Sequence, residues 1–330
     1  MTDKSAFKAC IYGAGAIGGW MGAGLARAGS TLSVVARGAT LDALRQHGLR
    51  VQSAGATSTT PVRASNDPSG LGVQDLVVVA VKGPALAEVA RHIAPLIGPD
   101  TVVMTAMNGV PWWFLQGFGG AFAGTPLKAV DARGDIAAAI PVRQVVGCVV
   151  HASCALLGPG HVQHHFGNRL ILGEPSGQAT ARVQAIAARL ARGGFEAVVS
   201  EQIQQDIWFK LWGNMTVNPV SALTGATTDR ILNDDLVRGF ISRVMLEAKE
   251  IGARIGIPID QQPEDRHAVT RKLGAFKTSM LQDVEAGKAV ELDALVTVVR
   301  ELGALTGVPT PFTDALLGLS RLQAQVRGLY

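Results

Sequence analysis

Cysteine is scarce in this chain: it has three cysteines, Cys10, Cys148 and Cys154, and no CxxC pair. An odd number without paired spacing argues against a disulfide framework or a cysteine-ligated metal site. We therefore expect buried, reduced thiols in a cytoplasmic protein. The N-terminus lacks the charged, apolar and small-residue pattern of a signal peptide, and its apolar residues are typical of a first strand.

Long apolar runs, dense basic runs and internal repeats are also missing. No uninterrupted apolar segment approaches the roughly 18–20 residues that a membrane helix requires, so no membrane partner is expected. The net charge is +4 without a cluster of Lys and Arg, which argues against nucleic acid and suits a small anionic ligand better. Charged residues make up 17% and hydrophobic residues 48%, so the 330 residues can form two domains with sizeable cores.

The first part of the chain alternates apolar runs with helix-like segments. The run DLVVVAVK is almost continuously apolar, as expected for a strand covered on both faces of a parallel sheet. The βαβαβ rhythm predicts an α/β fold with a Rossmann-type doubly wound sheet. The expected strands are 7–12, 30–37, 75–82 and 101–107, the expected helices are 16–28, 40–47 and 84–96, and the polar residues up to about 70 are expected to be irregular.

The remainder of the sequence has a different texture. Residues 145–174 hold short β-like runs separated by Gly-Pro-Gly and Gly-Asn, which predict antiparallel hairpins appended to the sheet. Nearly every later segment has a helical pattern, so we predict an α/β domain of residues 1–199 and an all-α C-terminal domain of residues 200–330. The expected helices are 201–224, 229–256, 263–286, 290–306 and one from about 312.

A glycine-rich segment, IYGAGAIGG, joins the first predicted strand to the first predicted helix. It places Gly13, Gly15 and Gly18 in GxGxxG spacing. The first glycine of this motif makes the tight turn, the second lets a pyrophosphate approach the backbone, and the third allows close helix–strand packing. Because the phosphate sits at the helix N-terminus, Ala16 and Ile17 are expected contacts too. The position favours dinucleotide binding over a purely structural glycine turn.

Three polar residues follow predicted strands, at the edge where ligands of open α/β sheets bind. Arg37 ends the second strand, where an acidic residue would bind the 2′-hydroxyl of NAD and an arginine accommodates the 2′-phosphate of NADP. NADP is therefore the favoured cofactor. Lys82 and Asn108 follow the next two strands, where the ribose and nicotinamide would lie. A solvated arginine and ordinary loop residues are the alternatives.

The segment IWFKLWGNMTVNP predicts a mostly apolar helix with one polar edge. At 100° per residue, Lys210, Asn214 and Asn218 fall within an arc of about 80°. An amine and two amides on such a helix are unfavourable unless they find partners, and a solvated stripe is the alternative. A second polar pair follows: Ser279 near the end of one predicted helix, and Glu291 in the first turn of the next, where capping is an alternative role.

In this order the motifs resemble those of the ketopantoate reductases (2-dehydropantoate 2-reductases). The resemblance runs from the glycine loop to about residue 310. The Lys-xxx-Asn-xxx-Asn-Pro helix with Ser and Glu at this distance is specific, whereas a GxGxxG loop alone is not. The matching segments are GxGxxG at 13–18, Lys82, NG at 108–109, KLWGNMTVNP at 210–219, SMLQD at 279–283 and ELD at 291–293.

The resemblance implies a role for each matching residue. Lys210 is expected to act as the general acid toward the substrate carbonyl, and Glu291 to contact the substrate and orient that lysine. The other expected substrate contacts are Asn108, Asn214, Asn218 and Ser279. Besides the glycine loop, the expected cofactor contacts are Arg37 (at the 2′-phosphate), Lys82, Asn108 and Glu291.

The residue types suit this chemistry. Reduction of a 2-oxo acid delivers a hydride to C2 while the oxygen gains negative charge, which a cationic lysine stabilises and then protonates. The resemblance implies NADPH-dependent reduction of ketopantoate to pantoate, in pantothenate and coenzyme A biosynthesis, in a cleft between the domains. The alternatives are a reductase of the same build for another 2-oxo or 3-hydroxy acid, and a non-catalytic dinucleotide sensor. The apolar helical domain could supply the interface of a homodimer.

Some features depart from the family pattern or fall outside it. Phe276 stands where some members carry a polar side chain, which leaves the identity of the acid open. Residues 110–124, VPWWFLQGFGGAFAG, could line the site, cover it or simply pack. Pro219 is expected to bend its helix or to end the polar edge. The histidines of HVQHHF lie in a predicted hairpin that does not place them on one face, so no metal is expected.

Overall fold

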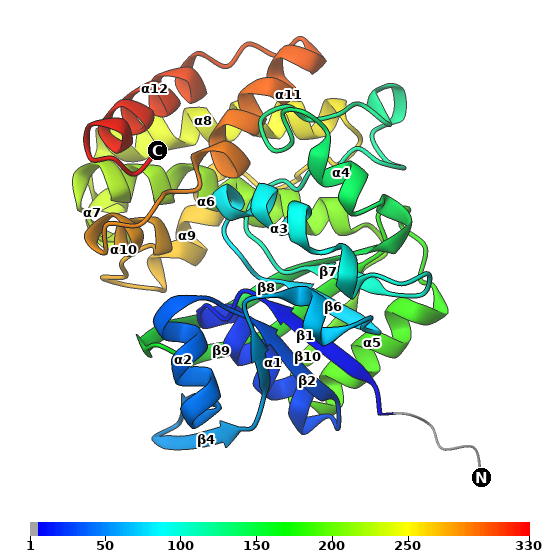
Figure 1. Ribbon diagram of the computed structural model, residues 1–330. Helices are drawn as coiled ribbons and strands as arrows, with labels where there is room; N and C mark the ends of the chain where they lie inside the picture. Colours follow the sequence, from blue (N-terminus) through cyan, green and yellow to red (C-terminus); the bar gives the residue numbers. More distant parts are fainter. Residues whose placement is uncertain (1–5) are drawn as a thin grey trace. The chain divides into compact units, whose positions relative to one another are not determined.

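The computed structural model describes residues 6–330, which form two compact units (Figure 1). The first unit comprises the chain up to Met107 together with Asp135–Ile203, and the second comprises Asn108–Gly134 together with Gln204–Tyr330. The sequence prediction divided the chain once, near residue 199, whereas the structure groups 108–134 with the later residues. None of the helices in residues 6–330 is both long and apolar enough to span a membrane.

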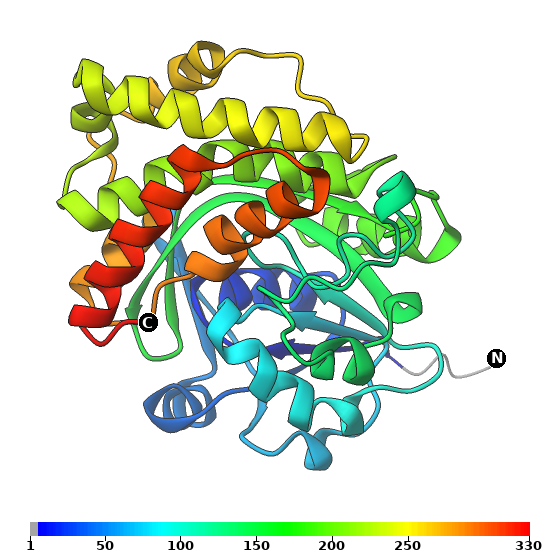
Figure 2. The ribbon, with the colours of Figure 1, turned by 90° about the horizontal axis from the view of Figure 1, so that it is seen from above.

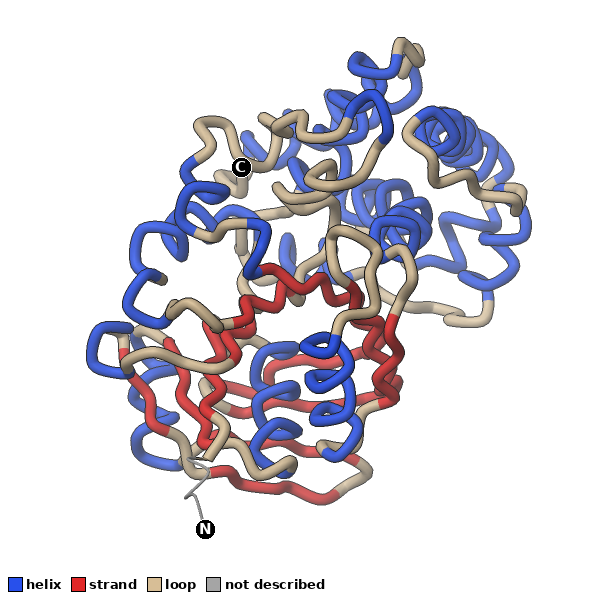
Figure 3. Tube along the Cα trace, turned by 90° about the vertical axis from the view of Figure 1, so that its right-hand side faces the viewer, coloured by secondary structure: helices blue, strands red, loops and turns tan. Residues whose placement is uncertain are grey.

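The first unit is built on one sheet, whose strands are red in Figure 3. The strands are β1 (Lys8–Tyr12), β2 (Thr31–Val35), β3 (Leu49–Ser53), β4 (Ala56–Thr60), β5 (Arg63–Ser65), β6 (Leu76–Val79), β7 (Val102–Thr105), β8 (Val145–Gly158), β9 (His161–Gly173) and β10 (Glu196–Val199). The α-helices are α1 (Ala16–Arg27), α2 (Gly38–His47), α3 (Leu86–His92), α4 (Asp135–Ala139) and α5 (Ala181–Arg192).

The strand order confirms the predicted doubly wound sheet. Neighbouring strands follow the order β4-β3-β9-β8-β7-β6-β1-β2-β5, with β10 paired to β9. All pairs from β5 to β8 along this path are parallel. The order therefore reverses between β1 and β6, and a doubly wound sheet binds its ligand beyond the carboxyl ends of the strands at such a switch point.

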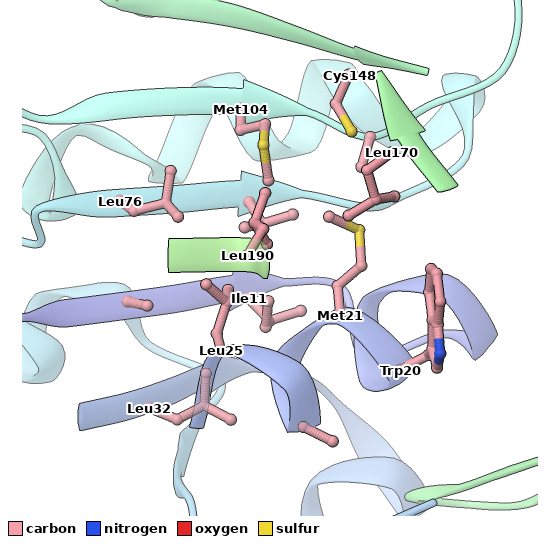
Figure 4. Close-up of a cluster of buried hydrophobic side chains, with 14 of the residues drawn as sticks. Ile11, Trp20, Met21, Leu25, Leu32, Leu76, Met104, Cys148, Leu170 and Leu190 are labelled. Atoms are coloured by element: carbon pink, nitrogen blue, oxygen red, sulfur yellow. The ribbon is translucent and has the colours of Figure 1, made fainter. Parts of the chain in front are cut away.

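A core cluster of this unit lies between the sheet and helices α1 and α5 (Figure 4). Ile11 of β1, Leu76 of β6 and Met104 of β7 are essentially fully buried, and Met21 and Leu25 of α1 pack among them. All four residues of β6 have an exposed fraction of 0%, which confirms the prediction from its β-branched run. A strand covered on both faces has no alternation of polar and apolar residues to display.

The expectation of irregular structure up to residue 70 is wrong, because β3, β4 and β5 lie there. β3 and β4 form an antiparallel hairpin whose two-residue turn, Ala54-Gly55, has φ values of 48° and 81°. Such a turn matches the twist of the flanking strands. The strand β4 is mostly exposed at the edge of the sheet, so its polar sequence carried no apolar pattern to detect.

The predicted appended hairpins are a single long hairpin inside the sheet. β8 pairs with β7 on one side and with β9 on the other, and β9 also pairs with β3 and β10. The Gly-Asn pair does not end a strand: Gly167, at φ +78°, lies within β9 where the register shifts opposite His151 and Ser153. In the sequence, the glycine of this β-bulge therefore could not be distinguished from the glycine of a turn.

The second unit is helical, which confirms the predicted class of the C-terminal region. Its helices are α6 (Ile203–Thr224), α7 (Thr228–Asn233), α8 (Asp235–Arg254), α9 (Pro263–Arg271), α10 (Ser279–Glu285), a π-helical turn (Asp293–Thr297), α11 (Val298–Thr306) and α12 (Pro311–Val326). Figure 2 shows α11 (orange) and α12 (red) beside α8 (yellow), and the three helices contact one another.

Two of the long predicted helices are interrupted. Asp234 separates α7 from α8 because its side chain accepts the Val237 N–H and caps α8. The predicted helix 263–286 is divided into α9 and α10, with Gly274 at φ +63° in the connection and Thr278 capping α10. Ser279 consequently opens α10 and does not end a helix. Pro219 lies inside α6, which ends at Thr224 as the predicted helix 201–224 does.

The aromatic segment that follows Asn108 packs into the second unit. Trp112, Trp113, Phe114 and Leu115 have exposed fractions of at most 3%. Of the three roles left open by the sequence, packing is the one that these side chains fulfil. In the first unit, Cys10 and Cys148 are buried, and burial raises the pKa of the Cys10 thiol to about 12.

Candidate active site

The glycine loop of the first unit lies at the switch point of the sheet. Gly13 has φ +98°, and a Cβ added to it would lie 2.6 Å from Cγ1 of Val81, the residue just before Lys82. A Cβ on Gly18 would lie 2.1 Å from the Gly13 carbonyl oxygen, so only glycine allows this helix–loop packing. A Cβ on Gly15, by contrast, would meet nothing within 4 Å. Open space above Gly15 is what a pyrophosphate needs in order to approach the backbone.

The first turn of α1 is suited to an anion. Gly15 is the N-cap residue, and α1 has no acidic side chain in its first turn. The N–H groups of Ala16, Ile17 and Gly18 belong to that turn, and first-turn N–H groups have no partner within their own helix. The glycine loop thus fits the phosphates of a dinucleotide.

Arg37 lies two residues after β2 and is the N-cap residue of α2. Its guanidinium forms an ion pair with Glu88 of α3, and the two side chains are 66% and 38% exposed. The nearby phenol of Tyr12 has a raised pKa, mainly because of burial and secondly because of the Glu88 charge. Glu88 was not predicted as a site residue from the sequence, although it lies only six positions beyond Lys82 in a predicted helix.

Lys82 follows β6 at the same edge of the sheet. It is the N-cap residue of the short 3₁₀ helix Gly83–Ala85 and is half-buried. Because β6 is the neighbour of β1 across the switch point, Lys82 and the glycine loop emerge from adjacent strands. Five of the predicted cofactor residues therefore lie at the carboxyl ends of β1, β2 and β6 in the first unit: Gly13, Gly15, Gly18, Arg37 and Lys82. The predicted cofactor contacts Asn108 and Glu291 belong to the second unit.

Helix α6 of the second unit is anchored by its tryptophans. Trp208 and Trp212 have exposed fractions of 1% and 0%. The indole N–H of Trp212 donates a hydrogen bond of 2.7 Å to the Met245 carbonyl of α8. A Cβ on Gly252 of α8 would lie only 2.4 Å from the Trp208 indole nitrogen. Both rings therefore fix α6 on α8 and orient its polar edge.

The polar edge of α6 contains Lys210, whose Nζ donates a hydrogen bond of 2.9 Å to Oδ1 of Asn108. These two residues are 102 positions apart in the chain, and the structure brings them together within the second unit. Asn214 is half-buried and Asn218 is 7% exposed. The edge is therefore not the fully solvated stripe that periodicity alone allowed.

The loop that carries Asn108 is attached to the π-helical turn. The Val110 N–H donates a hydrogen bond of 2.9 Å to the Ala294 carbonyl. Gly109 has φ +83°, and a Cβ on it would lie 2.3 Å from that same carbonyl oxygen. Glu291 is half-buried and lies just before the turn, two residues ahead of Asp293, so its predicted place in a first helical turn is wrong. π-helical turns are rare and frequent at functional sites.

Ser279 is exposed as the first residue of α10. The connection before it is tied to α7, because the Thr228 N–H donates to the Phe276 carbonyl and the Phe276 N–H donates to the Thr228 hydroxyl. The second unit thus contains all the predicted substrate residues: Asn108, Lys210, Asn214, Asn218, Ser279 and Glu291.

One histidine of the long hairpin, His164, serves packing. His164 stacks on Trp20 with ring centroids 5.3 Å apart, and its ring nitrogens contact the Ser53 hydroxyl and the Gly167 carbonyl. Residues 6–330 contain no group of three or more His, Cys, Asp or Glu side chains placed to hold a metal ion.

A doubly wound sheet whose glycine turn fits a phosphate, together with a helical unit that carries a lysine–amide edge, is typical of an oxidoreductase that uses a nicotinamide dinucleotide. Two family models match the chain: "Ketopantoate reductase PanE/ApbA" over residues 9–177 and "Ketopantoate reductase PanE/ApbA C terminal" over residues 202–324. The chain belongs to the ketopantoate reductase family and is an oxidoreductase acting on CH–OH groups.

Individual relatives cover nearly the whole chain. A 2-dehydropantoate 2-reductase of Mesorhizobium japonicum is 46% identical over 324 residues, which are 98% of this chain and 99% of that protein. A crystal structure from Ralstonia solanacearum MolK2, provisionally assigned as a ketopantoate reductase, is 61% identical with a TM-score of 0.95 and covers 99% of this chain and 100% of its own. D-mandelate dehydrogenase, solved with NADH and anilino(oxo)acetate, is 20% identical with a TM-score of 0.84 over 98% and 100% of the chains, and shares the fold.

Proposed function

We propose that this protein reduces 2-dehydropantoate (ketopantoate) to pantoate with NADPH, a step in pantothenate and coenzyme A biosynthesis. The observation that carries the proposal is the hydrogen bond between Lys210 Nζ and Asn108 Oδ1 on an otherwise apolar, anchored helix. The relative from Mesorhizobium japonicum, which is named for this reaction, supports the choice of substrate.

Lys210 is the general acid of the proposed mechanism. When bound, the nicotinamide cofactor supplies a hydride to C2 of the acid. The carbonyl oxygen then gains negative charge, which the Lys210 ammonium stabilises before it donates a proton to give the hydroxyl. Asn108 accepts a hydrogen bond from Nζ and so holds the ammonium in place. Lys210 regains its proton from solvent after each turnover.

The remaining polar residues of the second unit are proposed to bind and orient the substrate. Asn214, Asn218 and Ser279 offer neutral amides and a hydroxyl, which hold carboxylate and hydroxyl groups without titrating near neutral pH. Glu291 contacts the substrate and cofactor and keeps Lys210 oriented, because a carboxylate attracts an ammonium. Asn108 also lies between nicotinamide and substrate in this proposal.

The proposed preference for NADPH rests on Arg37, and it predicts the behaviour of two variants. Arg37→Met is expected to raise KM for NADPH about 10–100-fold, because a charged hydrogen bond to the 2′-phosphate is lost, and to leave KM for NADH unchanged. Glu88→Gln is expected to lower KM for NADPH about threefold, since the exposed carboxylate competes weakly for Arg37. Steady-state kinetics with both cofactors measures these effects.

Arg45 of the same helix α2 provides the control, because its side chain donates to the Ala64 carbonyl and not to a carboxylate. Arg45→Met should leave both KM values near those of the wild type. Equal increases for NADPH and NADH in Arg37→Met would show that Arg37 does not read the 2′-phosphate.

The proposed substrate is tested with a panel of 2-oxo acids, assayed by NADPH absorbance with NADH alongside. Ketopantoate is expected to have the highest kcat/KM. Turnover of another 2-oxo or 3-hydroxy acid at a higher kcat/KM would replace the proposed substrate, as the fold shared with D-mandelate dehydrogenase allows. Tight NADPH binding without turnover of any acid would instead favour a dinucleotide sensor.

Assembly into a homodimer stays a prediction. Helix α12 exposes apolar side chains at Leu319, Leu322 and Val326, with exposed fractions of 58%, 59% and 80%. Their spacing places them along one side of the helix, where a second copy could cover them. Light scattering after size-exclusion chromatography gives the mass in solution, and a monomeric mass would reject the dimer.

A further inference from the structure

One arginine of the second unit is packed against the helix that carries the proposed general acid. Arg266 lies in α9, and its guanidinium rests on α6 at Gly213. A Cβ added to Gly213 would lie 2.6 Å from Nε, 3.0 Å from Nη2 and 3.2 Å from Cζ of Arg266. Glycine at this position therefore makes the room that the guanidinium occupies.

The charge of Arg266 lacks a protein counterion among the described residues. Its Nε is buried and makes no hydrogen bond there, and the Phe209 ring is the neighbour that faces the charge, with Cζ 5.6 Å from the ring centroid. Burial lowers the pKa of the Arg266 guanidinium, and no acidic side chain acts against that shift. A cation–π contact offsets only part of the desolvation of a guanidinium, and arginines removed from water are normally paired with an anion.

The position of Arg266 relative to Lys210 follows from the geometry of α6. Gly213 comes three residues after Lys210 and directly before Asn214. Residues three apart on a helix are surface neighbours, with Cβ atoms about 5–6 Å apart. The guanidinium at Gly213 is thus beside the polar edge. The chain after α9 leads to the proposed substrate residue Ser279, the first residue of α10.

We propose that Arg266 binds the carboxylate of the 2-oxo acid and selects for acids over their neutral analogues. This inference rests on the proposed function, because it takes a 2-oxo acid as the substrate. The carboxylate of such an acid is one bond away from the carbonyl carbon, so Lys210 and Arg266 can hold neighbouring groups of one small molecule. A planar guanidinium matches a carboxylate with two parallel hydrogen bonds. The substrate thereby supplies the anion that the protein does not.

Arg266→Met tests this role, because methionine keeps apolar contacts with Phe209 and Gly213 but removes the charge. KM for ketopantoate is expected to rise about 10–100-fold, with KM for NADPH unchanged. Arg271→Met on the same helix is the matched control: Arg271 pairs with exposed Glu264 and should leave both constants near wild type. Arg266→Lys should be intermediate, and it replaces the methionine variant if that variant does not fold.

Unchanged KM for the acid in Arg266→Met would overturn the proposal. An increase in KM for NADPH alone would overturn it too, since the bound anion would then be a phosphate of the cofactor. A rise in KM for the acid that Arg266→Lys does not partly rescue, accompanied by a fall in melting temperature, would show a structural role and likewise reject it.

Binding without turnover separates this proposal from the proposed function. Calorimetry with NADP⁺-loaded protein compares oxamate, a carboxylate analogue of a 2-oxo acid, with neutral oxamide. The wild type should prefer oxamate about 10–100-fold, and Arg266→Met should lose that preference. The proposed function fails if no 2-oxo acid is reduced, whereas the Arg266 proposal fails if both proteins bind the two analogues alike or bind neither.

Discussion

Replacing Lys210 by methionine is expected to lower kcat for ketopantoate reduction about 10²–10⁴-fold, the range in which a positioned general acid contributes. The ammonium is the group that the structure holds in place, through the 2.9 Å hydrogen bond to Asn108 on a helix fixed by buried tryptophans. Without it the developing alkoxide loses the cation and proton donor of the proposed mechanism. NADPH binding, measured by fluorescence titration, should stay unchanged because the glycine loop belongs to the first unit.

The pH dependence of kcat adds a second readout. A general acid must be protonated, so wild-type kcat should fall as pH rises through the pKa of that acid, and Lys210→Met should lose this decrease. Lys272→Met, at the exposed end of α9, serves as the control and should retain wild-type kcat and pH profile. Turnover of Lys210→Met within a few-fold of the wild type would assign the proton transfer to another group.

Gly109→Ala is expected to destabilise the protein by about 3–5 kcal/mol and to lower kcat/KM together with stability. A side chain at φ +83° is strained, and its Cβ would lie 2.3 Å from the backbone carbonyl oxygen of Ala294. The carbonyl cannot rotate away without breaking the bond from the Val110 N–H. The loop must therefore leave the π-helical turn, and Asn108 would move away from Lys210.

Gly287→Ala is the matched control for this substitution. Gly287 is also a positive-φ glycine of the second unit, at φ +62°, but an added Cβ would meet nothing within 4 Å. It should cost only about 1–2 kcal/mol, the strain of a left-handed alanine. Urea unfolding of both variants gives the two free energies. Equal destabilisation would mean that the loop accommodates the extra methyl group and that contact with Ala294 does not hold it.

The parts of the fold that were predicted correctly have strong local patterns. The fully buried strand β6 has a continuous β-branched run, and α1 follows a GxGxxG turn. The local sequence of each element is therefore enough to predict it. The strand β4 does not, because an exposed edge strand needs no apolar face. The interior glycine of β9 is ambiguous for a related reason: φ above zero is common to turns and bulges, and only the pairing partner distinguishes them.

The candidate site, too, was predictable from the sequence only in part. Periodicity placed Lys210, Asn214 and Asn218 on one side of a helix, and the resemblance assigned them roles. Periodicity left open whether that side of the helix was solvated. The tertiary contact with Asn108, a residue 102 positions away, decides this point. Glu88 and Arg266 were not predicted, because an isolated charged residue on an amphipathic helix looks the same in sequence whether it is solvated, paired or desolvated.

Sequence alone established the class of fold, the glycine turn between the first strand and the first helix, and the helical character of the C-terminal region. These depend on local propensity and on side-chain periodicity, which are properties of neighbouring residues. The tertiary structure decided that residues 108–134 join the second unit, that the Asn108 loop rests on a π-helical turn, and that Arg266 is pressed against Gly213. Each of these is a contact between distant segments, and such contacts exist only once the chain has packed.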